Sequence, residues 1–128
     1  MIPKNGAAMR VLVVDDDDLV RTVAVDTLED AGFEVIEAAT AEEALDRCED
    51  RNTDLLFTDI MLSGSLDGWD IAERCRDAHP DLPVIYTTGY SLRAHRPVAG
   101  SRLLHKPYQT GELVRVVSEM VGQSRPSA

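Results

Sequence analysis

The 128-residue sequence lacks the features that mark membrane proteins and secreted proteins. No apolar run approaches the ~20 residues of a membrane-spanning helix, so we expect no membrane partner. Residues 1–10 contain one Lys and no apolar core before a cleavage site, which argues against a secretory signal. The two cysteines, Cys48 and Cys75, are too few for a disulfide framework and lie among apolar residues at helical spacing. We expect both to be small core residues of a protein in the reducing cytoplasm.

Basic residues are scarce in comparison with acids. Lys and Arg total 13 against 23 Asp and Glu, which gives a net charge of −10, and only two of the bases are Lys. This balance argues against a nucleic-acid partner, because phosphate binding needs clustered Lys and Arg. It suits a bound cation or a protein with a basic patch. Four of the acids, Asp15 to Asp18, directly follow an apolar run.

Apolar segments typical of strands alternate with segments of helical periodicity. The pattern predicts strands over 9–14, 33–38, 54–58, 83–88 and 102–105. Helices are predicted over about 19–30, 40–51, 68–78 and 113–122. We expect one domain over 9–122, with a flexible arm at 1–8 and a tail at 123–128. The alternation predicts an α/β fold, in which a doubly wound sheet of five parallel strands has helices on both faces.

The carboxyl ends of the predicted strands carry most of the reactive side chains. Ligands of such sheets bind outside these ends, so side chains far apart in sequence should meet there. Three close carboxylates repel one another unless a cation lies between them, and Mg²⁺ fits such oxygen ligands. A carboxylate nucleophile, a metal, a hydroxyl and an ammonium group are the parts needed for phosphoryl transfer. The residues concerned are Asp15, Asp16, Asp59, Thr88 and Lys106.

Five segments in this order resemble the receiver domain of bacterial two-component response regulators. They are residues 10–18, 54–59, 66–68, 83–89 and 106–108, and the resemblance covers about residues 9–122. It implies a flavodoxin-like (CheY-like) fold with strand order 2-1-3-4-5. It also implies a cytoplasmic protein, monomeric or weakly dimeric. Its expected partners are a sensor histidine kinase or phosphotransfer protein and a downstream protein target.

The resemblance assigns the phosphoryl chemistry to three residues. Asp59 would be the phosphoacceptor, taking a phosphoryl group from a phosphohistidine. Thr88 and Lys106 would each bind a phosphoryl oxygen after transfer. Thr87, the neighbour of Thr88, should face away from the site by strand alternation.

The resemblance also assigns a site for Mg²⁺ or Mn²⁺. Asp16 and Asp59 would bind the ion directly, and Asp15 through water or by orienting the site. The main-chain carbonyl of Met61 would complete the metal shell. The next two acids, Asp17 and Asp18, would cap the following helix, because anions favour a helix N-terminus.

Two segments depart from the receiver pattern. The loop after Asp59 is one residue longer than usual, and Ser63 stands where most relatives carry Pro. The stretch between Thr88 and Lys106 is several residues short. Because Pro97 and Gly100 lie within it, we expect the fourth helix of the family, over 91–100, to be short, irregular or absent.

The positions that tune switching are also unusual. Leu103 occupies the place of the family's switch Tyr or Phe, so coupled rotation with Thr88 cannot use it. Tyr90 could substitute, or output could rely on loop order alone. We therefore predict altered switching. Met61 and Tyr90 are both bulky, and we predict that they hinder attacking water and prolong the phosphorylated state.

Three alternatives remain open at this point. One is a haloacid-dehalogenase-type phosphatase with Asp15 as nucleophile, although the further acidic pair that this fold needs after Lys106 is missing. Another is a degenerate receiver that only binds a partner. The third concerns origin: the chain is either a stand-alone receiver, which its native-looking ends favour, or a receiver from a hybrid kinase. We expect no output domain after the last predicted helix.

Overall fold

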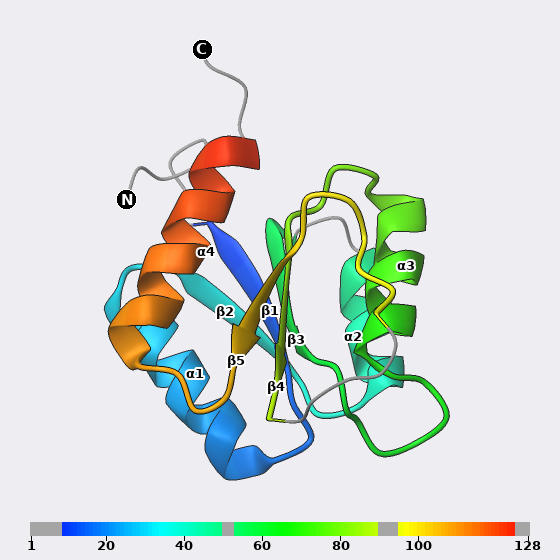
Figure 1. The fold of residues 1–128 in the computed structure, drawn as a ribbon, viewed down its shortest axis with the longest axis horizontal. Coiled ribbons are helices and arrows are strands. Elements are labelled where there is room, and N and C mark those ends of the chain that lie inside the picture. The colour runs from blue at the N-terminus through cyan, green and yellow to red at the C-terminus, as the bar shows by residue number, and fades with distance from the viewer. Residues whose placement is uncertain (1–8, 50–52, 90–94, 125–128) are drawn as a thin grey trace.

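Five strands and four helices alternate along most of the chain in the computed structural model, which describes residues 9–49, 53–89 and 95–124 (Figure 1). The first half contains β1 (Arg10–Val14), α1 (Asp18–Asp30), β2 (Glu34–Ala38) and α2 (Ala41–Glu49). The second half contains β3 (Leu55–Asp59), α3 (Gly68–Ala78), β4 (Val84–Thr88), β5 (Arg102–His105) and α4 (Thr110–Ser124). Each predicted strand is present, so the alternation seen in the sequence is confirmed.

All paired strands are parallel, and their order in the sheet is β2-β1-β3-β4-β5. This order confirms the predicted doubly wound fold. The middle strand β3 is buried along its whole length and pairs with both β1 and β4. Because every strand runs in the same direction, the carboxyl ends of all five lie at one edge of the sheet.

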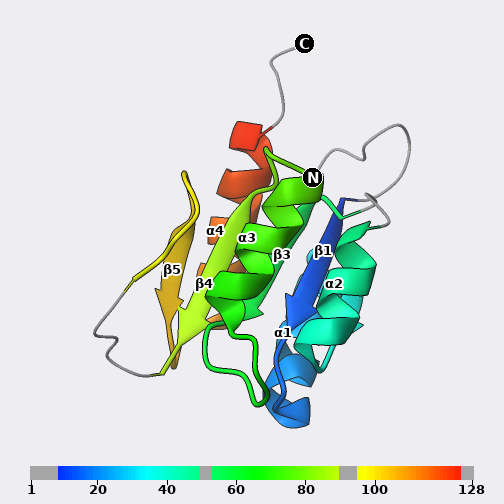
Figure 2. The same ribbon diagram turned by 90° about the vertical axis from the view of Figure 1, so that its right-hand side faces the viewer.

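Two helices cover each face of the sheet. In Figure 1, α1 and α4 lie on the left of the sheet and α2 and α3 on the right, and Figure 2 shows α2 and α3 from the front. Successive side chains of a strand point to opposite faces, so each strand supplies two apolar cores. Val13 and Phe57 pack on the side of α1 and α4, whereas Leu12 and Leu56 pack on the side of α2 and α3.

The connection from β4 to β5 follows the prediction of an irregular fourth helix where the structure describes it. Residues 95–101 contain a turn but no helix, and Gly100 has a positive φ of 75°. Residues 91–94 of the predicted helix, the arm at 1–8 and residues 125–128 of the tail lie outside the described residues. The last helix, α4, continues to Ser124, two residues beyond its predicted end.

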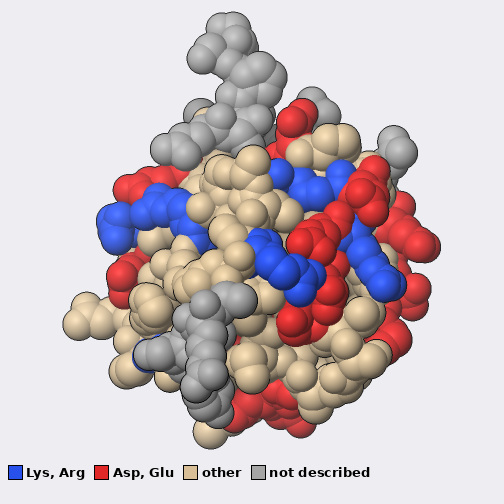
Figure 3. All heavy atoms as spheres, turned by 45° about the vertical axis from the view of Figure 1, so that its right-hand side comes forward, with Lys and Arg blue, Asp and Glu red and all other residues tan. Residues whose placement is uncertain are grey.

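Polar contacts hold this connection against α3 and β4. The guanidinium of Arg96 pairs with Asp70 and Glu73, both at 2.9 Å. The amide of Val98 donates a hydrogen bond of 3.1 Å to the hydroxyl of the buried Tyr86. On the face shown in Figure 3, basic groups lie among acidic groups instead of forming a separate basic patch.

The two cysteines form a bond that the sequence analysis missed. Both are buried, as expected, but Cys48 of α2 and Cys75 of α3 form a disulfide with a Cα–Cα distance of 5.6 Å. Their burial confirms the expectation of small core residues, whereas the disulfide was not predicted. The packing of α2 against α3 brings the residues within disulfide range, which the two helical patterns could not show separately. A disulfide does not support the predicted reducing environment.

None of the helices in the ranges described above is long and apolar enough to cross a membrane.

Candidate phosphoacceptor site

Side-chain alternation brings three of the predicted site residues to the same face of the sheet edge. Asp15, Asp59 and Lys106 each lie two positions after a strand residue that packs on the side of α1 and α4. Their side chains therefore continue the same row at the carboxyl ends of the strands. The strand residues that set this row are Val13, Phe57 and Leu104.

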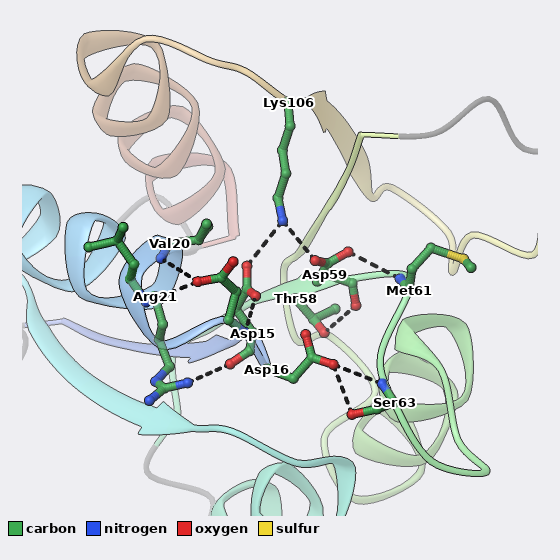
Figure 4. A network of polar contacts seen from close by, with 11 residues as sticks. Asp15, Asp16, Val20, Arg21, Thr58, Asp59, Met61, Ser63 and Lys106 are labelled. Carbon is green, nitrogen blue, oxygen red and sulfur yellow. Dashed lines mark hydrogen bonds and ion pairs between the residues drawn. The ribbon is translucent and has the colours of Figure 1, made fainter.

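The ammonium group of Lys106 joins two buried carboxylates. Its Nζ lies 2.7 Å from Oδ2 of Asp59 and 3.2 Å from Oδ2 of Asp15 (Figure 4). The second oxygens are bound by backbone amides: Met61 donates to Asp59 Oδ1 at 3.1 Å, and Asp17 donates to Asp15 Oδ1 at 2.9 Å. Asp15 is 4% exposed and Asp59 7% exposed, so little water shields these charges.

The inner part of the site has two buried carboxylates, Asp15 and Asp59, for the one ammonium group of Lys106. Burial raises the pKa of the Asp59 carboxyl above its ordinary value, and the Lys106 ammonium only partly offsets this effect. Burial acts to lower the pKa of Lys106, but the hydrogen bond and charge of Asp59, together with Asp15, outweigh burial and raise it. A further positive charge beside these two carboxylates would reduce their mutual repulsion.

Asp16 lies apart from this row because it follows Val14, which packs on the side of α2 and α3. Its carboxylate instead accepts two hydrogen bonds from Ser63, one from the amide and one from the hydroxyl, both 2.9 Å long. The amide of Ser63 is the largest influence that lowers the pKa of Asp16. The sequence did not predict this contact, although Ser63 in place of Pro was a visible signal.

The rest of the acidic run caps α1, as predicted. Asp17 is the N-cap residue, and its side chain accepts hydrogen bonds from the amides of Leu19 and Val20. Asp18 opens the helix and pairs with Arg21 at 2.6 Å. Arg21 also has a second role that the sequence did not predict, because its guanidinium donates to the Asp15 carbonyl at 2.6 Å. The three-residue spacing of Asp18 and Arg21 was the available signal for this pair.

A close backbone contact explains the glycine at the start of α3. The Gly68 amide donates to the Ile60 carbonyl at 2.9 Å, and a Cβ at Gly68 would overlap the carbonyl oxygen of Asp59. Only glycine lets the helix begin this close to the end of β3. The Asp67 side chain caps the helix through a reciprocal capping box with Asp70.

The two threonines of β4 are both buried. Thr87 pairs with Asp59 in the register of the sheet and follows Ile85 by two positions, so it shares the face of Asp59, and the expectation that it faces away was wrong. Its hydroxyl has no hydrogen-bond partner among the described residues. Thr88 is fully buried, and its carbonyl accepts a 2.8 Å hydrogen bond from the amide of Lys106. Thr88 therefore adjoins Lys106 through the backbone, and its contact with a phosphoryl group stays a prediction.

The predicted tuning residues occupy different surroundings. The side chain of Met61 is 50% exposed, while its amide binds Asp59. Leu103 is half-buried and packs against the apolar core on the side of α2 and α3. Tyr90 lies outside the described residues.

The oxygen donors of the site suit a hard divalent cation, although they do not form a complete ligand shell. Among residues 9–49, 53–89 and 95–124, no group of three or more His, Cys, Asp or Glu side chains is arranged to hold a metal ion. Mg²⁺ needs only one or two carboxylates, because it keeps several of its waters. The excess of carboxylates beside the single ammonium of Lys106 provides the charge for such an ion.

The fold and the site together define a class of protein: a doubly wound α/β domain with a lysine-bound carboxylate at the carboxyl edge of its central strand. The family model described as "Response regulator receiver domain" matches residues 11–118. The chain therefore belongs to the response regulator receiver domain family. It is a receiver of two-component signal transduction, and the phosphatase alternative is not favoured.

Individual relatives agree with this assignment. The chain is 30% identical over 116 residues to the response regulator receiver protein CpdR of Brucella abortus, covering 88% of this chain and 96% of that protein. The structure of a response regulator receiver protein from Sinorhizobium medicae aligns with a TM-score of 0.87 at 28% identity, covering 92% of this chain and 98% of the other.

A third comparison concerns a receiver that belongs to a kinase. The receiver domain of sensor histidine kinase PA1611 from Pseudomonas aeruginosa has a TM-score of 0.81 and 26% identity to this chain. The alignment covers 91% of this chain and 99% of that domain. That structure was solved with a magnesium ion coordinated in its active-site cleft.

Proposed function

We propose that Asp59 is the phosphoacceptor of this receiver and that transfer to it depends on Mg²⁺. The observation that carries the proposal is the position of the Asp59 carboxylate. It lies at the end of the central strand, almost buried, and bound through Oδ2 by Lys106 at 2.7 Å. A buried carboxylate held in one orientation is a suitable nucleophile, because its attack requires little reorganisation.

The proposed step transfers a phosphoryl group from the imidazole of a phosphohistidine. A carboxylate oxygen of Asp59 forms a bond to phosphorus, the phosphorus–nitrogen bond breaks, and the imidazole leaves with the electron pair. Lys106 then pairs with a phosphoryl oxygen, and the Thr88 hydroxyl donates to another. The Met61 amide, which donates to Asp59 Oδ1, keeps the nucleophile oriented. The product is an acyl phosphate.

The proposed metal site consists of Asp16, Asp59 and the Met61 carbonyl, with Asp15 acting through water or by orienting the site. Mg²⁺, or Mn²⁺ in its place, would supply positive charge to phosphoryl oxygens during transfer. The magnesium in the related receiver of PA1611 and the excess of carboxylates in this site support the proposal.

An apolar groove beside Lys106 is our candidate surface for the phosphodonor protein. The groove has a volume of about 610 Å³, and its walls include Leu19, Val23 and Pro107. Leu19 is 74% exposed and Val23 48% exposed, although both belong to the periodic apolar pattern of α1. A histidine kinase or phosphotransfer protein that covers these residues would bring its phosphohistidine next to Asp59. A downstream protein target is the second proposed partner.

The same proposal includes the lifetime of the acyl phosphate. Met61 is half-exposed, and its amide donates to the Asp59 carboxylate. We expect it to hinder attacking water, together with Tyr90, so that self-dephosphorylation is slow and no other catalytic turnover occurs. We expect the receiver unit to comprise residues 9–122 and to act in the cytoplasm as a monomer or weak dimer.

Labelling with a small phosphodonor tests the proposal. Incubation with acetyl phosphate and Mg²⁺ should add one phosphoryl group to the intact mass of the wild-type protein. Chelation of the metal should abolish the labelling, and Mn²⁺ should restore it. Asp59→Asn should not be labelled.

The matched control is Asp46→Asn, because Asp46 is an exposed acid of α2 away from the site. It should be labelled like wild type. Unchanged labelling of Asp59→Asn would refute the assignment, and loss of labelling in Asp46→Asn would show that the assay reports something other than the site.

A further inference from the structure

We propose that Ser63 is a positioning residue for the divalent cation: it holds Asp16 at the mouth of the site through one carboxylate oxygen. Both hydrogen bonds from Ser63 use Oδ2 of Asp16, so neither occupies Oδ1 (Figure 4). This arrangement leaves Oδ1 to act as a ligand. The inference rests on the proposed Mg²⁺-dependent function of the same site.

Charge explains why Asp16 needs a separate partner. The only lysine in the described part of the chain, Lys106, is already bound to Asp15 and Asp59. Asp16 is exposed and lies next to these carboxylates, whose repulsion favours turning it out into solvent. Two hydrogen bonds from Ser63 oppose that movement.

The loop is shaped to present Ser63 to Asp16. Gly64, the next residue, has a φ of 107°, a left-handed conformation that glycine adopts without a steric penalty, so the chain turns directly after Ser63. Proline at position 63 would have neither the amide hydrogen nor the hydroxyl. This contact is therefore specific to a sequence with Ser63, and it links the loop after β3 to the loop after β1.

Hydrogen bonds to the second oxygen of a ligating carboxylate raise metal affinity by fixing its orientation. We expect Ser63→Ala, which keeps the amide donor, to weaken Mg²⁺ binding about threefold. Ser63→Pro loses both donors and should weaken binding about tenfold. Ser63→Thr keeps both and should bind like wild type. The control Ser65→Ala, on the same exposed loop, should also bind like wild type.

Isothermal titration calorimetry of Mg²⁺ into the unphosphorylated protein measures these affinities without any phosphoryl transfer. In an Asp16→Asn background, Ser63→Ala should cause no further loss, because the oriented carboxylate is already gone. Thermal unfolding without metal should be the same for wild type and Ser63→Ala.

Three results would overturn the inference. The first is that Ser63→Ala binds Mg²⁺ as tightly as wild type or more tightly. The second is that Ser63→Ala lowers Mg²⁺ affinity by the same factor in the Asp16→Asn background as in wild type. The third is that wild type does not bind Mg²⁺. The proposed function fails separately: if Mg²⁺ binding depends on Ser63 but Asp59 is never labelled, the inference stands and the phosphoacceptor role is wrong. If Asp59 is labelled but Mg²⁺ affinity does not depend on Ser63, the phosphoacceptor role stands and the inference is wrong.

Discussion

The interior of the sheet and its carboxyl edge differ in the interactions that their buried side chains make. In the interior, apolar side chains such as Leu12 and Phe57 are almost completely buried and packed against helices on both faces. At the carboxyl edge, Asp15 and Asp59 share the single ammonium group of Lys106. Burial keeps the pKa of Asp59 raised there, because its charge is only partly compensated.

Because of this difference, we expect the interior to govern the stability of the fold and the edge to govern phosphorylation. The interior should determine most of the free energy of unfolding. The edge carries an excess of negative charge that suits the binding of a cation. Substitutions in the interior should therefore lower stability and leave phosphorylation intact. Substitutions at the edge should remove phosphorylation and leave stability unchanged or higher.

The largest expected effect on stability comes from reducing the disulfide between Cys48 and Cys75. The bond closes a loop with a sequence separation of 27 residues. Its reduction should lower the free energy of unfolding by about 3.5 kcal/mol, because the unfolded chain regains entropy. Urea titration with and without reductant measures the change. The variant carrying Cys48→Ala and Cys75→Ala controls for other effects of the reductant and should not respond to it.

Equal urea midpoints for the oxidised and reduced wild type would contradict the stabilising role of the disulfide. Labelling of Asp59 in the reduced protein should proceed as in the oxidised one. Loss of labelling on reduction would show that a change in the interior also affects phosphorylation at the edge.

Asp59→Asn should stabilise the protein by about 1 kcal/mol at neutral pH without metal, because it removes an incompletely compensated buried charge. Chemical denaturation in the presence of a chelator measures this gain. Asp46→Asn, at an exposed position, should leave stability nearly unchanged. A less stable Asp59→Asn would show instead that the ion pair with Lys106 outweighs the burial of Asp59.

The stabilisation by Asp59→Asn should depend on pH in a defined direction. The pKa of Asp59 is raised by burial from its ordinary value of 3.8, so the folded state binds the proton more tightly than the unfolded state. Wild type should therefore lose stability relative to Asp59→Asn as pH rises from 3.8 through the folded pKa, and the difference should stay constant above that. Denaturation curves at a series of pH values measure it. A difference that shrinks with rising pH would contradict the raised pKa.

Tyr86→Phe should have the smallest effect on stability. It removes the hydroxyl that accepts a 3.1 Å hydrogen bond from the amide of Val98. We expect a loss of about 0.5 to 1 kcal/mol and unchanged labelling of Asp59. Tyr108→Phe is the matched control, because its hydroxyl makes no hydrogen bond within the described ranges. Equal stability of the two variants would show that the Val98 contact does not hold the β4–β5 connection.

The fold and most of the inner site could be predicted because they follow from local periodicity. Strand alternation and parallel direction together place Asp15, Asp59 and Lys106 at one edge, whatever the detailed packing. Pro97 and Gly100 likewise indicated that the β4–β5 connection would be irregular, and residues 95–101 confirm this.

The features that were missed depend on how separate elements meet. The disulfide requires α2 and α3 to pack with Cys48 opposite Cys75. The contact of Ser63 with Asp16 requires a particular loop conformation around Gly64. Neither arrangement has a periodic signature in the sequence, so only the unusual residue type at position 63 pointed to a difference.

The most direct test of the central claim is to locate the phosphoryl group after labelling with acetyl phosphate and Mg²⁺. Reduction of the acyl phosphate with borohydride converts the labelled aspartate to homoserine, and peptide mass spectrometry then identifies its position. We predict homoserine at position 59 alone. Homoserine at position 15 or 16, or none in a protein whose intact mass shows the label, would contradict the claim.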